Sequence, residues 1–336
     1  MFIGHNTEVT LRVEVAAGAA FSVLVALAVA SRRPRSELPA ELATALENVG
    51  DTTGESWLNL FGVPLDAGAP HTGERLLDAL RSMDAVELRR QLLGRHAWSW
   101  CSLAGTDDIE AAAQGDDAAA ARLLEHPRYY GGHAAASLGV LLRVEPEETR
   151  ARLVKAVEAG LASLLDRSAL DDLEAAKRTA AATVTAQPPL LAIERLTTGY
   201  RYVPEPEAES VVLVPHREPE LPLLLAQHRS ARLIAYRARP ERGSEERLQE
   251  LGRALADPKR VEILALVGRG VGRAHELVTE TGLSRSTVHH HLALLRDAGL
   301  VALEGNARAY TYVPRRAAAA EAAELVADIV GSEVEA

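Results

Sequence analysis

The hydrophobic pattern is most regular near the C-terminus, where three short helices are expected to follow one another. The first begins at Asp257-Pro258, because aspartate can cap free backbone amides and proline fits the first helical position. The second is predicted over residues 274–281 and ends at Gly282. Ser284 is placed to cap a third helix, predicted over residues 285–298. Two helices joined by a tight turn, the second of them well capped, are typical of a helix-turn-helix.

The third of these helices has one apolar and one polar face. At 100° per residue, Val288, Leu292 and Leu295 form a single stripe, with His291 beside it. In a helix-turn-helix the second helix enters the major groove, where arginine can bridge two acceptors of guanine and hydroxyl groups can meet phosphate. The polar first turns hold the residues that we expect to bind DNA, which are Arg285, Ser286, Thr287, His289 and His290.

Two short β-prone runs follow the third helix, at residues 300–303 and 309–313. Gly305-Asn306 between them predicts a turn, and Arg308 would project from this hairpin toward the minor groove or the DNA backbone. Three helices and a hairpin in this order predict a winged helix-turn-helix domain over residues 244–336.

The upstream part of the chain is predicted to be mainly α with small β elements. Val9 to Val15 alternates apolar and polar residues as a strand does, and residues 15–30 are expected to form buried structure that ends in a helix. Successive amphipathic helices are then predicted from residue 39 to about residue 195.

After Gln187-Pro188-Pro189 the amphipathic helical pattern gives way to short β-prone runs, which predict a small antiparallel sheet. The Val9 to Val15 strand is a candidate member of this sheet. Its β-prone runs lie at residues 200–203, 210–214, 221–225 and 233–237. The expected organisation is therefore an α-rich N-terminal domain with this small antiparallel sheet over residues 1–240, followed by the winged helix-turn-helix domain over residues 244–336.

The charge distribution agrees with a DNA-binding C-terminal domain. The whole chain of 336 residues has a net charge of −10, which argues against non-specific nucleic-acid binding over its whole surface. Residues 252–316, in contrast, hold ten Lys or Arg and six Asp or Glu. The positive charge is thus concentrated where the helix-turn-helix is predicted.

Several kinds of site are not supported by the sequence. Cys101 is the only cysteine, which excludes an internal disulfide and any multi-cysteine metal site and favours a reducing cytoplasm. No nucleotide-binding or nucleophile motif indicates an enzyme, and no cofactor is expected. The apolar stretch at residues 15–30 is shorter than the ~20 residues that a membrane-spanning helix needs, so no membrane association is expected.

Two clusters allow alternative interpretations. His289-His290-His291 could suggest a metal site, but consecutive helical positions point about 100° apart, so DNA contact or an exposed surface is favoured and no metal is expected. Aromatic residues of the helical region could line a ligand pocket, although simple core packing is the more ordinary explanation. The candidates for such a pocket are Trp98, Trp100, Tyr129 and Tyr130.

The last 90 or so residues resemble the ArsR/SmtB family of bacterial winged-helix regulators, through LADPKRVEILALV, HELVTETGLSRSTVHHHLALLRDAGLV and GNARAYTYV. This resemblance implies DNA contact by the residues named above on the third helix and by Arg308 in the wing. It also implies a homodimer formed by the helices near residues 246–255 and 317–330. Such a dimer would read a pseudo-palindromic operator in double-stranded DNA, with repression as the default outcome.

The sequence departs from the metal sensors of that family. Their cysteine-containing segment corresponds here to residues 271–277, which hold no cysteine, and the last helix offers Glu321, Glu324 and Asp328 without any histidine. A non-metal effector bound in the N-terminal domain is therefore one expectation. The alternative is that the N-terminal domain is a protein-interaction or scaffold module without a small ligand.

Overall fold

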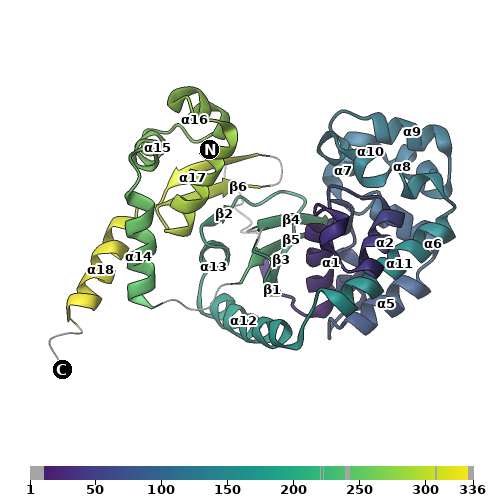
Figure 1. Cartoon of the computed structure of the whole chain (residues 1–336), viewed down its shortest axis with the longest axis horizontal. Helices are drawn as coiled ribbons and strands as arrows, with labels where there is room; N and C mark the ends of the chain where they lie inside the picture. Colours follow the sequence, from purple (N-terminus) through teal and green to yellow (C-terminus); the bar gives the residue numbers. More distant parts are fainter. Residues whose placement is uncertain (1–10, 220, 222, 239–242, 307–308, 332–336) are drawn as a thin grey trace, which may run out of the picture. The chain divides into compact units, whose positions relative to one another are not determined.

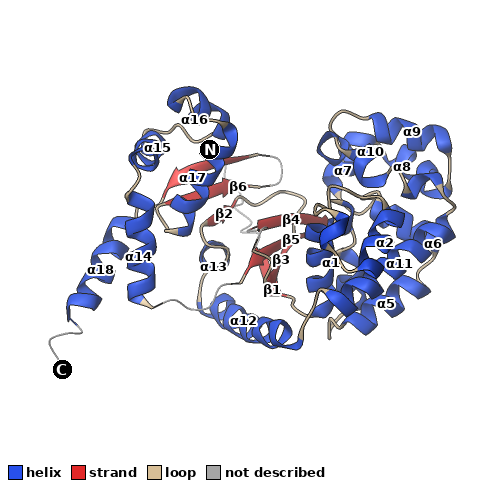
Figure 2. Cartoon of the chain, viewed as in Figure 1, coloured by secondary structure: helices blue, strands red, loops and turns tan. Residues whose placement is uncertain are grey.

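The computed structural model describes residues 11–219, 221, 223–238, 243–306 and 309–331. It is mainly helical with two small sheets, which confirms the predicted fold class (Figure 2). The chain divides into two compact units, one formed by Met1–Ala182 with Pro206–Ala238 and the other by Thr183–Glu205 with Arg239–Ala336. Figure 1 labels most of the elements of both units.

The N-terminal unit is a helical body with one mixed sheet. Its strands are β1 (Arg12–Val15), β3 (Ser210–His216), β4 (Leu223–His228) and β5 (Ala231–Arg237). Its helices are α1 (Ala19–Ala30), α2 (Ala40–Val49), α3 (Ser56–Asn59), α4 (Gly62–Ala67), α5 (Gly73–Ser82), α6 (Ala85–Leu92), α7 (Trp98–Ala104), α8 (Thr106–Gln114), α9 (Asp117–Glu125), α10 (Ala134–Leu138), α11 (Pro146–Ser163) and α12 (Arg167–Ala186), and its 3-10 segments are Arg35–Glu37, Tyr129–Gly132 and Leu141–Arg143.

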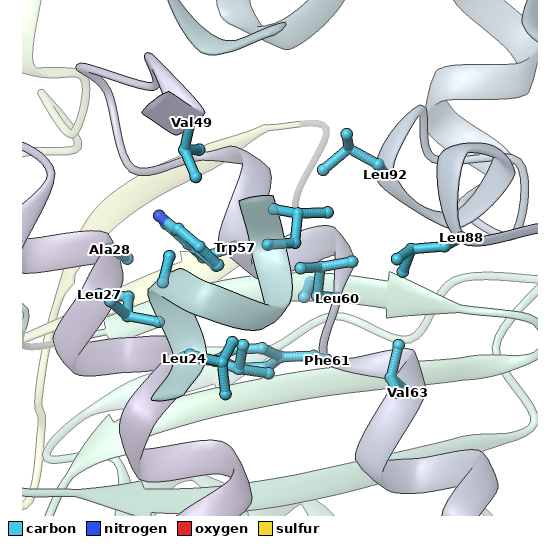
Figure 3. Packing of buried hydrophobic residues seen from close by; sticks show 14 of the residues in the cluster. Leu24, Leu27, Ala28, Val49, Trp57, Leu60, Phe61, Val63, Leu88 and Leu92 are labelled. Carbon is cyan, nitrogen blue, oxygen red and sulfur yellow. The ribbon is translucent and has the colours of Figure 1, made fainter. Parts of the chain in front are cut away.

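Helix α1 is the centre of this unit. Every residue from Ala20 to Ala30 is buried, as expected of a helix that is apolar on all sides. It packs against α3, α5, α11 and β3, and Figure 3 shows Trp57 of α3 lying over Leu27 and Ala28. The indole nitrogen of Trp57 donates a hydrogen bond to the hydroxyl of Ser31 at 2.9 Å. No described helix is long and apolar enough to cross a membrane.

The sheet of this unit corrects one prediction. Its strand order is β1-β3-β5-β4, with β1 parallel to β3, β3 parallel to β5, and only β4 antiparallel to β5. The predicted antiparallel sheet is therefore wrong in strand direction, because alternation of apolar residues reports which face is buried and not which way a neighbouring strand runs. Arg12–Val15 does join the sheet, at the edge next to β3.

The C-terminal unit holds the predicted winged helix-turn-helix together with a segment from upstream. Its helices and strands are α13 (Pro189–Leu196), β2 (Tyr200–Tyr202), α14 (Ser244–Leu255), α15 (Pro258–Gly268), α16 (Ala274–Thr281), α17 (Arg285–Asp297), β6 (Val301–Gly305), β7 (Tyr310–Pro314) and α18 (Ala318–Gly331).

Strand β2 corrects the predicted domain boundary. Residues 200–203 were expected in the N-terminal sheet, yet β2 pairs in parallel with β6 of the wing, in a three-stranded sheet ordered β2-β6-β7. The boundary at residues 240–244 therefore separates the chain only in part, since Thr183–Glu205 packs with the C-terminal unit. A three-residue strand carries too little pattern for its distant partner to be read from sequence.

Candidate nucleic-acid interface

Helix α17 begins where the sequence predicts because its N-terminus is capped by a side chain. The hydroxyl oxygen of Ser284 accepts a hydrogen bond from the backbone amide of Thr287 at 3.2 Å. The same oxygen lies 2.9 Å from the hydroxyl of Ser286 and 2.8 Å from that of Thr287. Gly282, with a φ of 66°, ends the preceding helix in the left-handed conformation that glycine tolerates best. The tight turn between α16 and α17 thus rests on local interactions.

One face of α17 is locked into the core of the C-terminal unit. Val288, Leu292 and Leu295 are fully buried, as their predicted stripe requires. This stripe packs against a cluster of buried residues from the other elements, namely Ile263, Leu266, Val267, Leu277 and Val301. Burial of that stripe fixes the rotation of the helix about its own axis, so the opposite face must point outward.

The outward face carries the residues predicted to bind DNA. Arg285, Ser286 and His290 are exposed, whereas Thr287 and His289 are half-buried. All five lie in the first two turns of the helix, beside the capped end. Their contact with DNA stays a prediction. Arg308, the predicted wing contact, lies outside the described residues.

The histidine run is divided between the surface and the core. His291 is buried, and burial lowers its pKa despite the opposing effect of the Asp257 carboxylate. The ring centroids of His290 and His291 are 6.1 Å apart, with 48° between the ring planes. No group of three His, Cys, Asp or Glu side chains among the described residues is arranged to hold a metal ion.

The aromatic residues proposed as a ligand pocket belong to the N-terminal unit and are mostly packed together. Tyr129 and Tyr130 are fully buried, and their hydroxyls donate hydrogen bonds to the backbone carbonyls of Leu93 and Leu92. Trp100 stacks on Tyr130 with 5.5 Å between ring centroids. Trp98 instead lies under the guanidinium of Arg232, 4.9 Å from its ring centroid.

These contacts are those of a packed core. The phenol groups of both tyrosines donate hydrogen bonds to backbone carbonyls. The rings of Trp100, Tyr129 and Tyr130 pack against one another. The arrangement gives no support to a pocket lined by all four residues, and a ligand there stays a prediction.

Sequence reasoning missed a group of charged side chains beside the wing. Arg201 of β2 lies 3.1 Å from the carboxylate of Glu194 and 4.0 Å from that of Glu304 on β6. Arg315, just after β7, lies 3.5 Å from Glu194 and 2.9 Å from Glu321 of α18. These ion pairs connect the upstream segment to the wing and to the last helix. Nothing in the local pattern of residues 194–201 indicated such partners.

Comparison with known proteins agrees with the geometry of this unit. The family described as "Bacterial regulatory protein, arsR family" matches residues 257–302. The HTH-type transcriptional regulator CmtR of Mycobacterium tuberculosis is 44% identical over 68 residues, which are 20% of this chain and 58% of CmtR. The HTH-type transcriptional regulator YgaV of Escherichia coli K12 is 39% identical over 70 residues, which are 20% of this chain and 71% of YgaV. No solved structure matches the chain significantly.

Proposed function

Because this chain belongs to the arsR family of bacterial regulatory proteins through its C-terminal domain, we propose that it is a transcriptional regulator that binds double-stranded DNA sequence-specifically. The observation that carries the proposal is the outward face of α17. A buried stripe and a side-chain cap hold this face in one orientation, and Arg285 and His290 are exposed on it. The chain spans 58% of the length of the CmtR proteins that it matches, so the role of the whole protein is part of this proposal.

We further propose that the regulator is a homodimer. Helices α14 and α18 pack against each other and leave large apolar side chains in solvent, with Leu255 40%, Val326 46% and Val330 65% exposed. Apolar side chains exposed together on neighbouring helices are typical of a protein interface. A twofold dimer would present two α17 helices to successive major grooves of a pseudo-palindromic operator, about one DNA turn apart. Repression would follow where the operator overlaps a promoter, in the cytoplasm.

For the N-terminal unit we propose a protein-interaction or scaffold role. Its aromatic side chains are used in packing, as the stacked pair of Trp100 and Tyr130 illustrates. Ligand-dependent stabilisation of the N-terminal unit in a thermal-shift screen would contradict this proposal.

The decisive experiment is binding of the full chain to DNA from around its own gene. Fluorescence anisotropy at several salt concentrations, with scrambled DNA as competitor, separates specific binding from general attraction to phosphate. We expect salt-dependent binding that survives the competitor. If neither these fragments nor genome-wide selection of bound DNA yields a preferred sequence, the proposed function is wrong.

A further inference from the structure

A large cavity lies within the C-terminal unit, away from the outward face of α17. Its volume is about 920 Å³, in the range of pockets that hold small organic molecules. Residues of α13, α14 and α18 line it, together with the turn before β2 and the last residues of α17. The upstream segment Thr183–Glu205 therefore supplies part of the wall, and the family match over residues 257–302 does not include that segment.

Arginines outnumber the carboxylates in the polar lining. Five of them line the cavity, against four carboxylates, which are Glu194, Glu250, Asp297 and Glu321. Arg201 and Arg315 are neutralised by the ion pairs with Glu194 and Glu321 described above. The other three arginines, which have no ion-pair partner among the described residues, are Arg195, Arg247 and Arg296.

Arg296 is the most informative of the three. The residue is 9% exposed, and its Nε has no hydrogen-bond partner among the described residues. A guanidinium with a buried, unbonded Nε and no ion-pair partner loses part of its hydration without compensation, which is unfavourable. An anion entering the cavity would supply the missing partner, and guanidinium groups bind carboxylate or sulfonate oxygens in two-pronged geometry.

The remaining lining is apolar. Leu191 of α13 is 55% exposed although it is a large hydrophobic residue, and Leu251 and Leu325 face the same cavity from α14 and α18. Ala318 and Ala322 of α18 keep that side of the cavity wide. A ligand with an apolar body beside its charged group would therefore fit better than a simple inorganic anion.

The backbone at the cavity is also unusual. Thr198 and Gly199, which line it, have φ values of 54° and 84°. Positive φ is ordinary for glycine but is an outlier for a β-branched residue, and such conformations gather at binding sites. The turn is held by the hydroxyl of Thr197, which donates to the carbonyl of Ile193 at 2.6 Å and accepts from the amide of Tyr200 at 3.2 Å.

We propose that this cavity binds an amphipathic organic anion, with its carboxylate or sulfonate beside Arg296 and its apolar body against Leu191, Leu251 and Leu325. We also propose that the bound anion weakens DNA binding, a part of the inference that rests on the function proposed above. Arg296 and Gly299 at the end of α17 touch the same cavity as α14 and α18. A ligand that prefers one arrangement of these helices shifts DNA affinity by the difference in its own affinity for the two arrangements.

The test uses the full chain and the fluorescent anion 1-anilinonaphthalene-8-sulfonate as probe. Titration without DNA measures binding directly, so its outcome does not depend on the proposed DNA-binding function. Arg296→Gln removes the buried cation, and Ala322→Glu adds a carboxylate without removing any buried group. Arg269→Gln is the matched control, because Arg269 is exposed and lies outside the cavity. We expect at least tenfold weaker probe binding, about 1.4 kcal/mol, in the first two variants and no change in the control.

Two results would overturn the site. Equal probe affinity in the wild type and all three variants would mean adventitious dye binding only. Loss of probe binding as the dimer forms would mean that a second copy of the chain fills the cavity. The proposed effect on DNA binding is tested with operator DNA that carries a fluorophore emitting in the red, away from the emission of the probe. A saturating concentration of the probe should weaken DNA binding at least about fivefold in the wild type and in the Arg269→Gln control. Unchanged or tighter DNA binding would refute that part, whereas absence of any specific DNA binding would refute the proposed function instead.

Discussion

Tyr200 donates a hydrogen bond from its phenol to the backbone carbonyl of Gly305, 2.9 Å away and 105 positions later in the chain. Two backbone hydrogen bonds flank this contact, from Leu303 to the carbonyl of Gly199 at 2.8 Å and from Val203 to the carbonyl of Gly305 at 2.9 Å. The segment upstream of the DNA-binding domain is therefore hydrogen-bonded to β6, the first strand of the wing.

Replacing Tyr200 by phenylalanine should loosen this junction without disturbing its packing. The phenol is buried, but the Gly305 carbonyl keeps its bond from Val203, so the expected cost is about 1 kcal/mol. Amide hydrogen exchange over residues 301–305 should become about fivefold faster. Tyr310→Phe is the control, because Tyr310 is 54% exposed. Equal exchange in the wild type and both variants would mean that the phenol does not stabilise the wing.

The C-terminal unit was largely predictable because its signals are local. The cap at Ser284, the glycine after α16 and the spacing of Val288, Leu292 and Leu295 each act within one or two helical turns. Secondary structure, exposed face and predicted DNA-binding residues follow from such signals directly.

Other features depend on residues that are far apart in sequence. The pairing of β2 with β6 joins positions about 100 residues apart, and the cavity gathers side chains from α13 to α18. The parallel pairing of β1 with β3 is of the same kind. An alternating or amphipathic pattern indicates that a residue is buried, but it does not indicate which element packs against that residue.

Arg285→Ala should lower both affinity and base preference if α17 reads the operator. A two-pronged arginine contact to guanine contributes about 1–3 kcal/mol, so specific binding should weaken about 5-fold to 150-fold. Anisotropy with the operator and with single-base variants of it measures both quantities. Arg269→Ala removes the same charge from an exposed position outside α17 and should change little. If Arg285→Ala binds all these DNAs as the wild type does, the assignment of α17 to the major groove is wrong.

Arg308→Ala tests the wing separately. A contact to phosphate attracts every DNA sequence alike, so this variant should bind operator and competitor DNA more weakly by the same factor. The slope of log affinity against log salt concentration should fall by about one. A selective loss of operator binding would instead indicate that Arg308 reads bases.

Ser284 allows helix stability to be separated from DNA affinity. Ser284→Ala removes the acceptor for the Thr287 amide and should destabilise the C-terminal unit by about 1 kcal/mol. Ser284→Asp retains a capping oxygen, so the unit should stay as stable as the wild type. Its new negative charge would nonetheless lie beside Arg285, at the end of α17 that should meet phosphate, and DNA binding should weaken.

Hydrogen exchange of the α17 amides and anisotropy together distinguish the two Ser284 variants. Ser284→Asp with protected amides but weaker DNA binding is the expected combination. Wild-type DNA affinity in Ser284→Asp would show that the N-terminus of α17 does not approach the DNA.

His216 should make the N-terminal unit sensitive to acid. Its side chain is 1% exposed, and burial, assisted by the positive charge of Arg237, lowers its pKa from 6.5 to about 3. In the unfolded chain the imidazole gains a proton below pH 6.5, whereas in the folded unit it stays neutral until about pH 3. The stability that depends on the neutral ring is therefore complete above pH 6.5 and is lost as the pH falls toward 3.

His216→Phe should remove this part of the acid sensitivity. One pKa unit corresponds to about 1.4 kcal/mol, so lowering the pH from 6.5 to 5.0 should cost the wild type about 2 kcal/mol more than the variant. All three tryptophans lie in the N-terminal unit, so urea unfolding followed by tryptophan fluorescence reports on that unit alone. Burial also lowers the pKa of His71 and His228 in both proteins, so only the difference between the proteins belongs to His216. The exposed His133→Gln should behave as the wild type does. An equal loss of stability in the wild type and His216→Phe would mean that His216 binds its proton as readily in the folded unit as in the unfolded chain.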